Sequence, residues 1–259
     1  MTAHIDPVPG APCWVSLMTG ALEPAEEFYG TVLGWRFQPG SLGEEFVVGY
    51  HDGVPVAGIG AVARSYGVPV GWTPYFAVPD MDAAAARVRE RAATVAVGPL
   101  QLGEGRVALA ADPHGGRFGM WQGTVLPSWH AGRREPPARL DLRTRDAFAA
   151  AIFYAQVLGW TDSGDADSCD VQYAEDTVAV LAGGHVAATL YGGAVEAAPD
   201  PRVRPHWEVA FYVDDLEAAA EAALAAGGSL SAENGTGPGP AVTLADPDGA
   251  LFTLRPRGR

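Results

Sequence analysis

The chain of 259 residues has few cysteines, few basic residues and no long apolar run. Its two cysteines, Cys13 and Cys169, cannot form a disulfide framework or a cysteine metal cluster, so we expect two reduced thiols. Only 17 Lys and Arg oppose 31 Asp and Glu, which gives a formal net charge of -14. An anionic surface repels nucleic acids and anionic membranes, so we expect neither as a partner.

Apolar stretches stay well below the roughly 18–20 residues that a membrane helix needs. The first residues lack the basic start and apolar core of a signal peptide, so we expect a cytoplasmic protein. Neither a phosphate-binding P-loop nor a GxSxG nucleophile motif is present, so phosphoryl transfer and serine hydrolysis have no support. The 48% hydrophobic content is enough for a sizeable core.

The sequence repeats itself, and the repeat predicts its organisation. Three landmarks occur twice in the same order: FYGTVLGW at 28–35 and FYAQVLGW at 153–160, AVPDMD at 77–82 and YVDDLE at 212–217, ADPHG at 111–115 and ADPDG at 245–249. We predict two homologous modules, 5–125 and 137–259. A polar, proline-containing linker at 126–136 separates them.

Each module divides again into two strand–helix–three-strand units. In the first unit, residues 12–18 predict a strand and residues 22–33 a helix with one apolar face, ended by Gly34. Asp80, Asp146 and Asp215 precede the other three helices and are predicted N-caps. The pattern predicts an α+β fold of four βαβββ units.

Four βαβββ units, with FYxxVLGW after the first strand and ADPxG before the last, resemble the vicinal oxygen chelate superfamily. This superfamily includes glyoxalase I, bleomycin-resistance proteins and extradiol dioxygenases. The resemblance covers nearly the whole chain, and it implies two glyoxalase-type modules with cupped mixed sheets. The motifs are specific for the fold and weak for function, because the superfamily includes enzymes and pure binding proteins.

The resemblance also implies where metal ligands would stand, usually two His or Gln side chains and one Glu. Carried over residue by residue, the positions hold Trp14, Thr73 and Gly119 in the first module. In the second module they hold Arg139, Glu208 and Thr253. Indole, guanidinium and glycine cannot ligate a divalent ion, so we expect no metal and no other cofactor.

In place of ligands, the first module offers aromatic and hydroxyl side chains. Alternation along the strands puts Trp14, Ser16, Thr73, Tyr75 and Trp121 on the ligand-facing side. Aromatic rings with a few hydroxyls suit stacking against a flat or conjugated molecule. The alternative is that these rings simply fill the cup as core.

The second module is charged at the corresponding positions. Alternation puts Arg139 and Asp141 on one face, and likewise His206, Glu208 and Tyr212, followed by Thr253 on the last strand. Arg139 could anchor an anionic ligand group, with His206 or Glu208 as general acid or base. The alternative is a set of ion pairs that plugs a degenerate cup.

Three functions follow. The first is metal-independent binding of a small aromatic or conjugated metabolite, as in antibiotic sequestration. The second is a metal-independent isomerase, cyclase or lyase of secondary metabolism, with Arg139 stabilising an oxyanion. The third is a conventional metal-dependent glyoxalase or dioxygenase. We expect a small-molecule partner and a monomer or homodimer.

Overall fold

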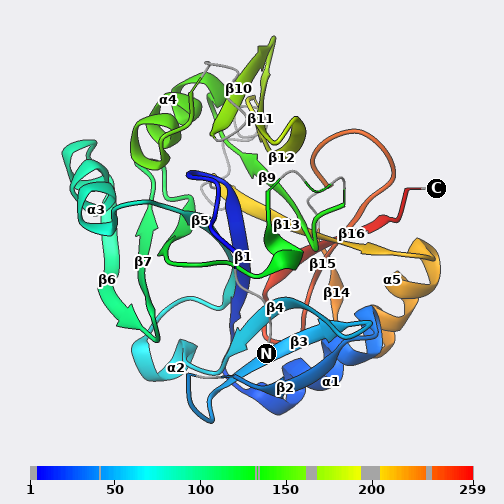
Figure 1. Cartoon of the computed structure of the whole chain (residues 1–259). Helices are drawn as coiled ribbons and strands as arrows, with labels where there is room; N and C mark the ends of the chain where they lie inside the picture. Colours follow the sequence, from blue (N-terminus) through cyan, green and yellow to red (C-terminus); the bar gives the residue numbers. More distant parts are fainter. Residues whose placement is uncertain are drawn as a thin grey trace. The chain divides into compact units, whose positions relative to one another are not determined.

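The computed structural model describes residues 5–40, 42–131, 133, 135–161, 168–193, 205–231 and 235–258. It contains the four predicted repeats (Figure 1). The first comprises β1 (Pro12–Met18), α1 (Leu22–Leu33), β2 (Arg36–Pro39), β3 (Phe46–His51) and β4 (Val54–Gly60). The second comprises β5 (Gly71–Ala77), α3 (Met81–Glu90), β6 (Thr94–Leu102), β7 (Gly105–Ala111) and β8 (Arg117–Gln122).

The third repeat comprises β9 (Arg139–Arg143), α4 (Ala147–Leu158), β10 (Cys169–Ala174), β11 (Thr177–Ala182) and β12 (His185–Tyr191). The fourth comprises β13 (His206–Val213), α5 (Leu216–Ala225), β14 (Ser229–Leu230), β15 (Val242–Ala245) and β16 (Leu251–Pro256). Two short elements fall outside the pattern, α2 (Ala63–Tyr66) and the 3-10 turn Pro127–Trp129. That turn lies in the predicted linker, in which residues 132 and 134 are outside the described residues.

The strands form two eight-stranded mixed sheets, one for each half of the chain. Their orders are β2-β3-β4-β1-β5-β8-β7-β6 and β10-β11-β12-β9-β13-β16-β15-β14, which are identical under the repeat. In each repeat the first strand pairs in parallel with the last, and the intervening strands pair antiparallel. The α+β class and the tandem architecture are confirmed.

Local signals placed most of the elements correctly. The carboxylates of Asp80, Asp146 and Asp215 each accept a hydrogen bond from the backbone N–H three residues later, at 2.9–3.0 Å, as N-caps do. Gly34 ends α1 in the left-handed conformation, with a φ of 66°. Asp52 and Gly53 both have positive φ, as the Asp-Gly sequence favours in the tight turn between β3 and β4.

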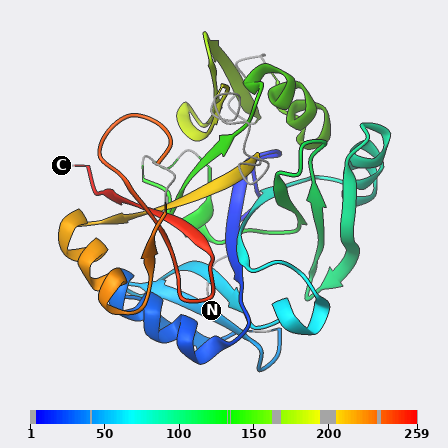
Figure 2. The ribbon, with the colours of Figure 1, turned by 180° about the vertical axis from the view of Figure 1, so that it is seen from behind.

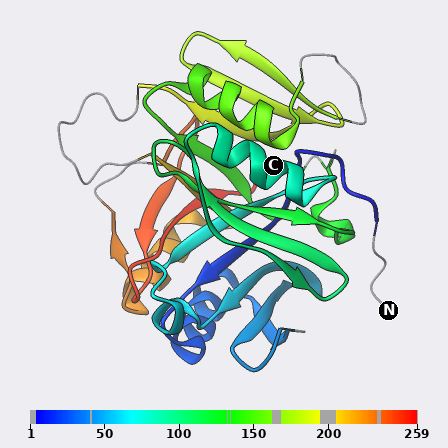
Figure 3. The same ribbon diagram turned by 90° about the vertical axis from the view of Figure 1, so that its left-hand side faces the viewer.

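Packing divides the chain into two compact units that do not coincide with the sequence repeats, and the module boundaries remain a prediction. We call them the α1–α5 unit (Trp14–Thr73, Pro137–Arg139 and Glu208–Arg259) and the α3–α4 unit (Met1–Cys13, Pro74–Pro136 and Leu140–Trp207). In the first, α1 packs against α5 (Figure 2). In the second, α3 packs against α4 (Figure 3).

A buried Trp–Tyr–Asp chain lies in the core of the α1–α5 unit. Trp72 Nε1 donates to the Tyr29 hydroxyl at 2.9 Å, and this hydroxyl donates to Asp246 Oδ2 at 3.0 Å. Burial and the neighbouring Asp246 carboxylate raise the pKa of Tyr29, so its hydroxyl stays protonated. Burial also raises the pKa of Asp246, against the effect of its N–H and O–H donors.

The α3–α4 unit contains the same chain. Trp207 Nε1 donates to the Tyr154 hydroxyl, which donates to Asp112 Oδ2, both at 2.9 Å. In both units the tyrosine comes from an FYxxVLGW motif and the aspartate from an ADPxG turn. The two repeated motifs therefore serve the core, because the tyrosine of one repeat hydrogen-bonds to the aspartate of another.

The two ADPxG turns differ at one position, Asp248 against His114, and their contacts differ with it. Asp248 Oδ2 accepts from two residues in the segment that leads into α1, from the Thr19 hydroxyl at 2.7 Å and from the Gly20 N–H at 2.6 Å. Ala21, the residue before α1, provides no side-chain cap. At the equivalent turn, His114 is exposed, and helix α4 has a cap in Asp146.

Replacing Asp248 with alanine should lower the free energy of unfolding by about 1 kcal/mol, the usual net contribution of a hydrogen bond. The Thr19 hydroxyl and the Gly20 N–H hold the pKa of Asp248 below its ordinary value of 3.8. The stabilisation is therefore complete above that value and is lost as the pH falls through the lower pKa of the folded state. Denaturant unfolding of both proteins from pH 7 to pH 3 measures the difference.

His114→Ala is the matched control, because it changes the equivalent turn at an exposed side chain and should leave stability unchanged. Equal losses in the two variants would contradict a stabilising role of the Asp248 hydrogen bonds. A loss for Asp248→Ala that stays constant down to pH 3 would contradict it as well.

Candidate functional site

In the first module, the position where the superfamily resemblance places a metal-ligating glutamate is Gly119, and it has no room for a side chain. Gly119 on β8 lies opposite Tyr75 on β5. A Cβ at Gly119 would lie 2.2 Å from Cδ1 of Tyr75, far inside van der Waals contact. Tyr75 is only 8% exposed, so its ring takes the space that a ligating side chain from Gly119 would need.

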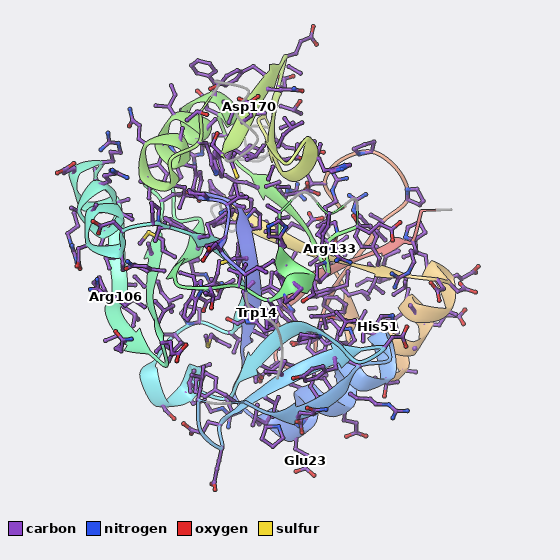
Figure 4. All side chains as sticks on the ribbon, viewed as in Figure 1. Trp14, Glu23, His51, Arg106, Arg133 and Asp170 are labelled. Carbon is purple, nitrogen blue, oxygen red and sulfur yellow. The ribbon has the colours of Figure 1, made fainter. Side chains whose placement is uncertain are left out.

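The two predicted cup tryptophans also lie over glycines. The Trp14 ring lies over Gly58 of β4, with Nε1 3.1 Å from the place of a Cβ there (Trp14 is labelled in Figure 4). The Trp121 ring covers Gly105, where a Cβ would lie 2.4 Å from the ring atom Cη2. Trp121 Nε1 donates to the Thr124 carbonyl at 3.0 Å. Both tryptophans are partly exposed. Backbone contact fixes each ring while leaving part of it accessible.

The hydroxyl positions predicted beside these rings are buried. Ser16 is 8% exposed and lies opposite Gly58, and Thr73 is 7% exposed. Trp14, Ser16 and Thr73 belong to the α1–α5 unit, whereas Tyr75 and Trp121 belong to the α3–α4 unit. The structure therefore shows the strand and the burial of each residue, and a site shared by all five remains a prediction.

The candidate residues of the second module differ in their burial and in their hydrogen bonds. Glu208 is 6% exposed and both its oxygens accept from the Thr236 N–H, at 3.2 and 3.1 Å, while Oε2 also accepts from the Thr236 hydroxyl at 2.8 Å. The Thr253 hydroxyl is fully buried and hydrogen-bonds to that of Thr243 at 2.9 Å. Asp141 is buried as well, and Arg139, His206 and Tyr212 are partly exposed.

Arg139, Glu208, Tyr212 and Thr253 belong to the α1–α5 unit, and Asp141 and His206 to the α3–α4 unit. The predicted approach of Arg139 to Glu208 and Asp141 therefore remains a prediction. The contacts of Glu208 with Thr236 favour the plugged interpretation of this module, because the chain's own N–H and hydroxyl groups already occupy this buried carboxylate.

A divalent metal does not fit the residues at these positions. In the first module the ring of Tyr75 fills the glutamate place, and in the second both oxygens of Glu208 accept hydrogen bonds from Thr236. Among the residues that the structure describes, no group of three or more His, Cys, Asp or Glu side chains could hold a metal ion. The donor set thus disagrees with the metal chemistry implied by the superfamily.

Sequence reasoning missed three features. They are the glycines under the aromatic rings, the hydrogen bonds of Asp248 to the segment before α1, and the segment at 235–238 that covers Glu208. The sequence around that segment, NGTGPGP, predicts a loop through its glycines and prolines. No local pattern shows which buried side chains the loop binds.

The fold and these residues define the class of protein to which the chain belongs. The model of the glyoxalase-like domain matches residues 139–255. The chain is 32% identical over 271 residues to the anthracycline biosynthesis proteins DnrV of Streptomyces peucetius and DauV of Streptomyces sp. (strain C5), covering 95% of this chain and 93% of each relative. It is equally similar, over 267 residues and 94% of the relative, to the candidate glyoxylase CFP32 of Mycobacterium tuberculosis (strain CDC 1551 / Oshkosh).

Solved structures show the same fold at low sequence identity. The Mn(II)-bound glyoxalase from Novosphingobium aromaticivorans aligns with a TM-score of 0.58 and 16% identity, over 96% of this chain and 82% of that one. Homoprotocatechuate 2,3-dioxygenase from Brevibacterium fuscum aligns with a TM-score of 0.56, at the same identity and coverage. The chain belongs to the glyoxalase-like family of the vicinal oxygen chelate superfamily. No helix in the described ranges is both long and apolar enough to cross a membrane.

Proposed function

We propose that this protein binds a small aromatic or conjugated metabolite without a metal ion. The observation that carries the proposal is the pair Tyr75 and Gly119, in which an aromatic ring fills the place of the metal-ligating glutamate. A protein of this superfamily that has lost its ligands retains the fold but needs another way to hold a ligand. Stacking on fixed aromatic rings is such a way.

The settings of the two tryptophans support this proposal. Each ring is held on backbone by a glycine, so binding costs little side-chain entropy, and each stays partly exposed. Both come from strands of the same sheet, β1 and β8. Two relatives are anthracycline biosynthesis proteins, which favours a fused-ring metabolite of secondary metabolism as the ligand.

Replacing Trp14 or Trp121 with alanine should weaken the binding of a fused-ring probe such as 1,8-dihydroxyanthraquinone by about tenfold, because one stacking face is lost. Isothermal titration calorimetry is the suitable measurement. Tryptophan fluorescence is less suitable because each variant removes one of the tryptophans that report binding. Phe148→Ala is the control, because Phe148 is 58% exposed and lies outside the predicted site. Unchanged affinity in both tryptophan variants, or an equal loss in the control, would contradict the proposal.

The biosynthetic relatives also favour a second candidate, a metal-independent isomerase, cyclase or lyase with Arg139, His206 and Glu208 as catalytic residues. The contacts of Glu208 with Thr236 count against Glu208 as the base while that segment stays in place. This candidate predicts that the wild-type protein converts an anthracycline-type intermediate and that Arg139→Ala abolishes the conversion. Such a result would show that the protein is an enzyme.

Exhaustive dialysis against a chelator should change neither probe affinity nor thermal stability, because tryptophan, glycine and arginine stand at three of the six ligand positions and supply no metal donor. Metal analysis of the purified protein provides an independent measurement. About one Mn, Fe, Ni or Zn per chain, lost together with binding on dialysis, would instead support a metal-dependent glyoxalase or dioxygenase.

A further inference from the structure

A cluster of buried polar side chains lies on one face of the fourth repeat, within the α1–α5 unit. Glu208 and Arg255 are 6% and 5% exposed, and the hydroxyl residues Thr243 and Thr253 are 7% and 0% exposed. Strand register places them together: Thr253 lies opposite both Ala210 and Thr243, and Arg255 lies opposite Tyr212. Charged side chains are rarely buried this deeply without partners, because desolvation is costly.

The partners come from one short segment, Gly235–Pro238, which we call the strap. It belongs to the connection between β14 and β15, drawn in orange in Figure 1. Glu208 accepts from both the N–H and the hydroxyl of Thr236, at 2.8–3.2 Å. Arg255 Nη2 donates to the Thr236 carbonyl, and Nη1 donates to the Pro238 carbonyl at 3.0 Å.

The strap lies directly against the sheet. A Cβ at Gly235 would lie 2.7 Å from the Ala241 Cβ and 3.2 Å from Cγ2 of Thr253, so only glycine allows this approach. The strap thereby covers Glu208 and Thr253, the two positions of this repeat where the superfamily resemblance places ligand contacts. Arg255 Nε remains buried, with no hydrogen-bond partner in the part of the chain that the structure describes.

These contacts have the character of ligand recognition. The Glu208 carboxylate accepts from the N–H of Thr236, and the Arg255 guanidinium donates to the C=O of the same residue. Two groups of opposite charge thus bind the donor and the acceptor of one amino-acid residue. Packing alone would not require two buried charges here, because apolar side chains could cover an apolar loop at lower cost.

We propose that this face is a binding site for secondary amides, occupied here by the protein's own strap. A ligand with an N–H donor and a nearby C=O acceptor, such as a peptide or an amide-bearing metabolite, enters when the strap is displaced. Glu208 accepts the N–H, and Arg255 donates to the C=O. The site is independent of the aromatic ligand proposed above, since none of Trp14, Tyr75 and Trp121 takes part.

The first experiment tests whether the strap covers the site. Thr236→Pro removes the N–H that donates to both oxygens of Glu208, and Pro238→Ala, which keeps its carbonyl, is the matched control. Phenylglyoxal modifies accessible arginines, and peptide mass mapping follows Arg255, with the exposed Arg36 as internal reference. Thr236→Pro loses the backbone hydrogen bonds to the Glu208 carboxylate, so the strap should open more often and expose Arg255. We expect Arg255 to react at least about tenfold faster in Thr236→Pro than in the wild type or in the control.

Thr236→Val removes only the hydroxyl and keeps the backbone contacts, so it provides a milder variant if the proline disturbs folding. It should raise the reactivity of Arg255 by a smaller factor, and circular dichroism checks that the fold is retained. Equal reactivity of Arg255 in the wild type and in both folded Thr236 variants would overturn the role of the strap.

The second experiment tests recognition with N-acetyl-L-threonine N-methylamide, which reproduces residue 236 with its flanking amides. NMR titration should show saturable binding to Thr236→Pro, and wild-type binding at least about tenfold weaker, because the probe must displace the strap. The depsipeptide analogue, in which an ester oxygen replaces the threonine N–H, should not bind. Binding of both probes alike, or of neither to a folded strap variant with reactive Arg255, would overturn the proposal. Neither result depends on an aromatic ligand.

Discussion

Replacing Tyr154 with phenylalanine should lower the free energy of unfolding by about 3 kcal/mol, although the change removes one oxygen atom. The Tyr154 hydroxyl is fully buried between Trp207 Nε1 and Asp112 Oδ2. Without it, Trp207 N–H loses its acceptor and Asp112 loses one of its donors, in surroundings where water cannot replace them. The cost is that of unsatisfied buried polar groups, which exceeds the net gain from an ordinary hydrogen bond.

Denaturant unfolding at pH 7 measures the loss, and Tyr173→Phe is the matched control because Tyr173 is 51% exposed. Tyr29→Phe should cost a similar amount, since it occupies the same place between Trp72 and Asp246. Burial and the Asp112 carboxylate raise the pKa of Tyr154, so the loss should be constant across neutral pH. A loss below about 1 kcal/mol in both tyrosine variants would mean that the network does not hold the two cores.

Replacing Gly119 with valine should also cost about 3 kcal/mol, near the upper end of the range for overpacking. Gly119 does not have positive φ, so its backbone accepts any residue and only space excludes a side chain. That space is taken by the Tyr75 ring, whose Cγ, Cδ1 and Cε1 atoms would all lie within 2.7 Å of the new Cβ. The ring would have to leave its position.

A double-mutant cycle tests this explanation. In a Tyr75→Ala background the ring is absent, so Gly119→Val should cost less than about 1 kcal/mol and give a coupling of about 2 kcal/mol. Urea unfolding of the four proteins measures the coupling. Additive losses would show that the glycine is required for another reason, and the argument against a glutamate at this position would then fail.

Much of the fold could be predicted from local patterns. The repeated motifs gave four βαβββ units because each motif recurs at the same place in its unit. Asp80, Asp146 and Asp215 act as N-caps because capping involves only residues three apart in sequence. Helix faces were predictable for the same reason: Met81, Ala84, Ala85 and Val88 are all buried, as the 3.6-residue period requires.

The same periodicity was less accurate at the ends and edges of helices. The apolar spacing in residues 22–33 predicts a buried face of Leu22, Ala25, Tyr29, Val32 and Leu33. Leu22 is in fact partly exposed, and Phe28, which this spacing omits, is almost fully buried. Phe28 packs edge-on against Phe252, with ring centroids 5.8 Å apart. A contact with a residue so distant in sequence widens the buried face beyond what one helix predicts.

The sequence by itself determined the repeats, the strand alternation and the helix caps, because each depends on residue type and short spacing. Only the tertiary structure decided which repeats pack together and what covers the buried charges. Tyr29 and Asp246 are 217 positions apart, and Glu208 and Thr236 are 28 apart. Such pairs form because folding must satisfy every buried polar group, and their choice depends on where distant strands bring the chain together.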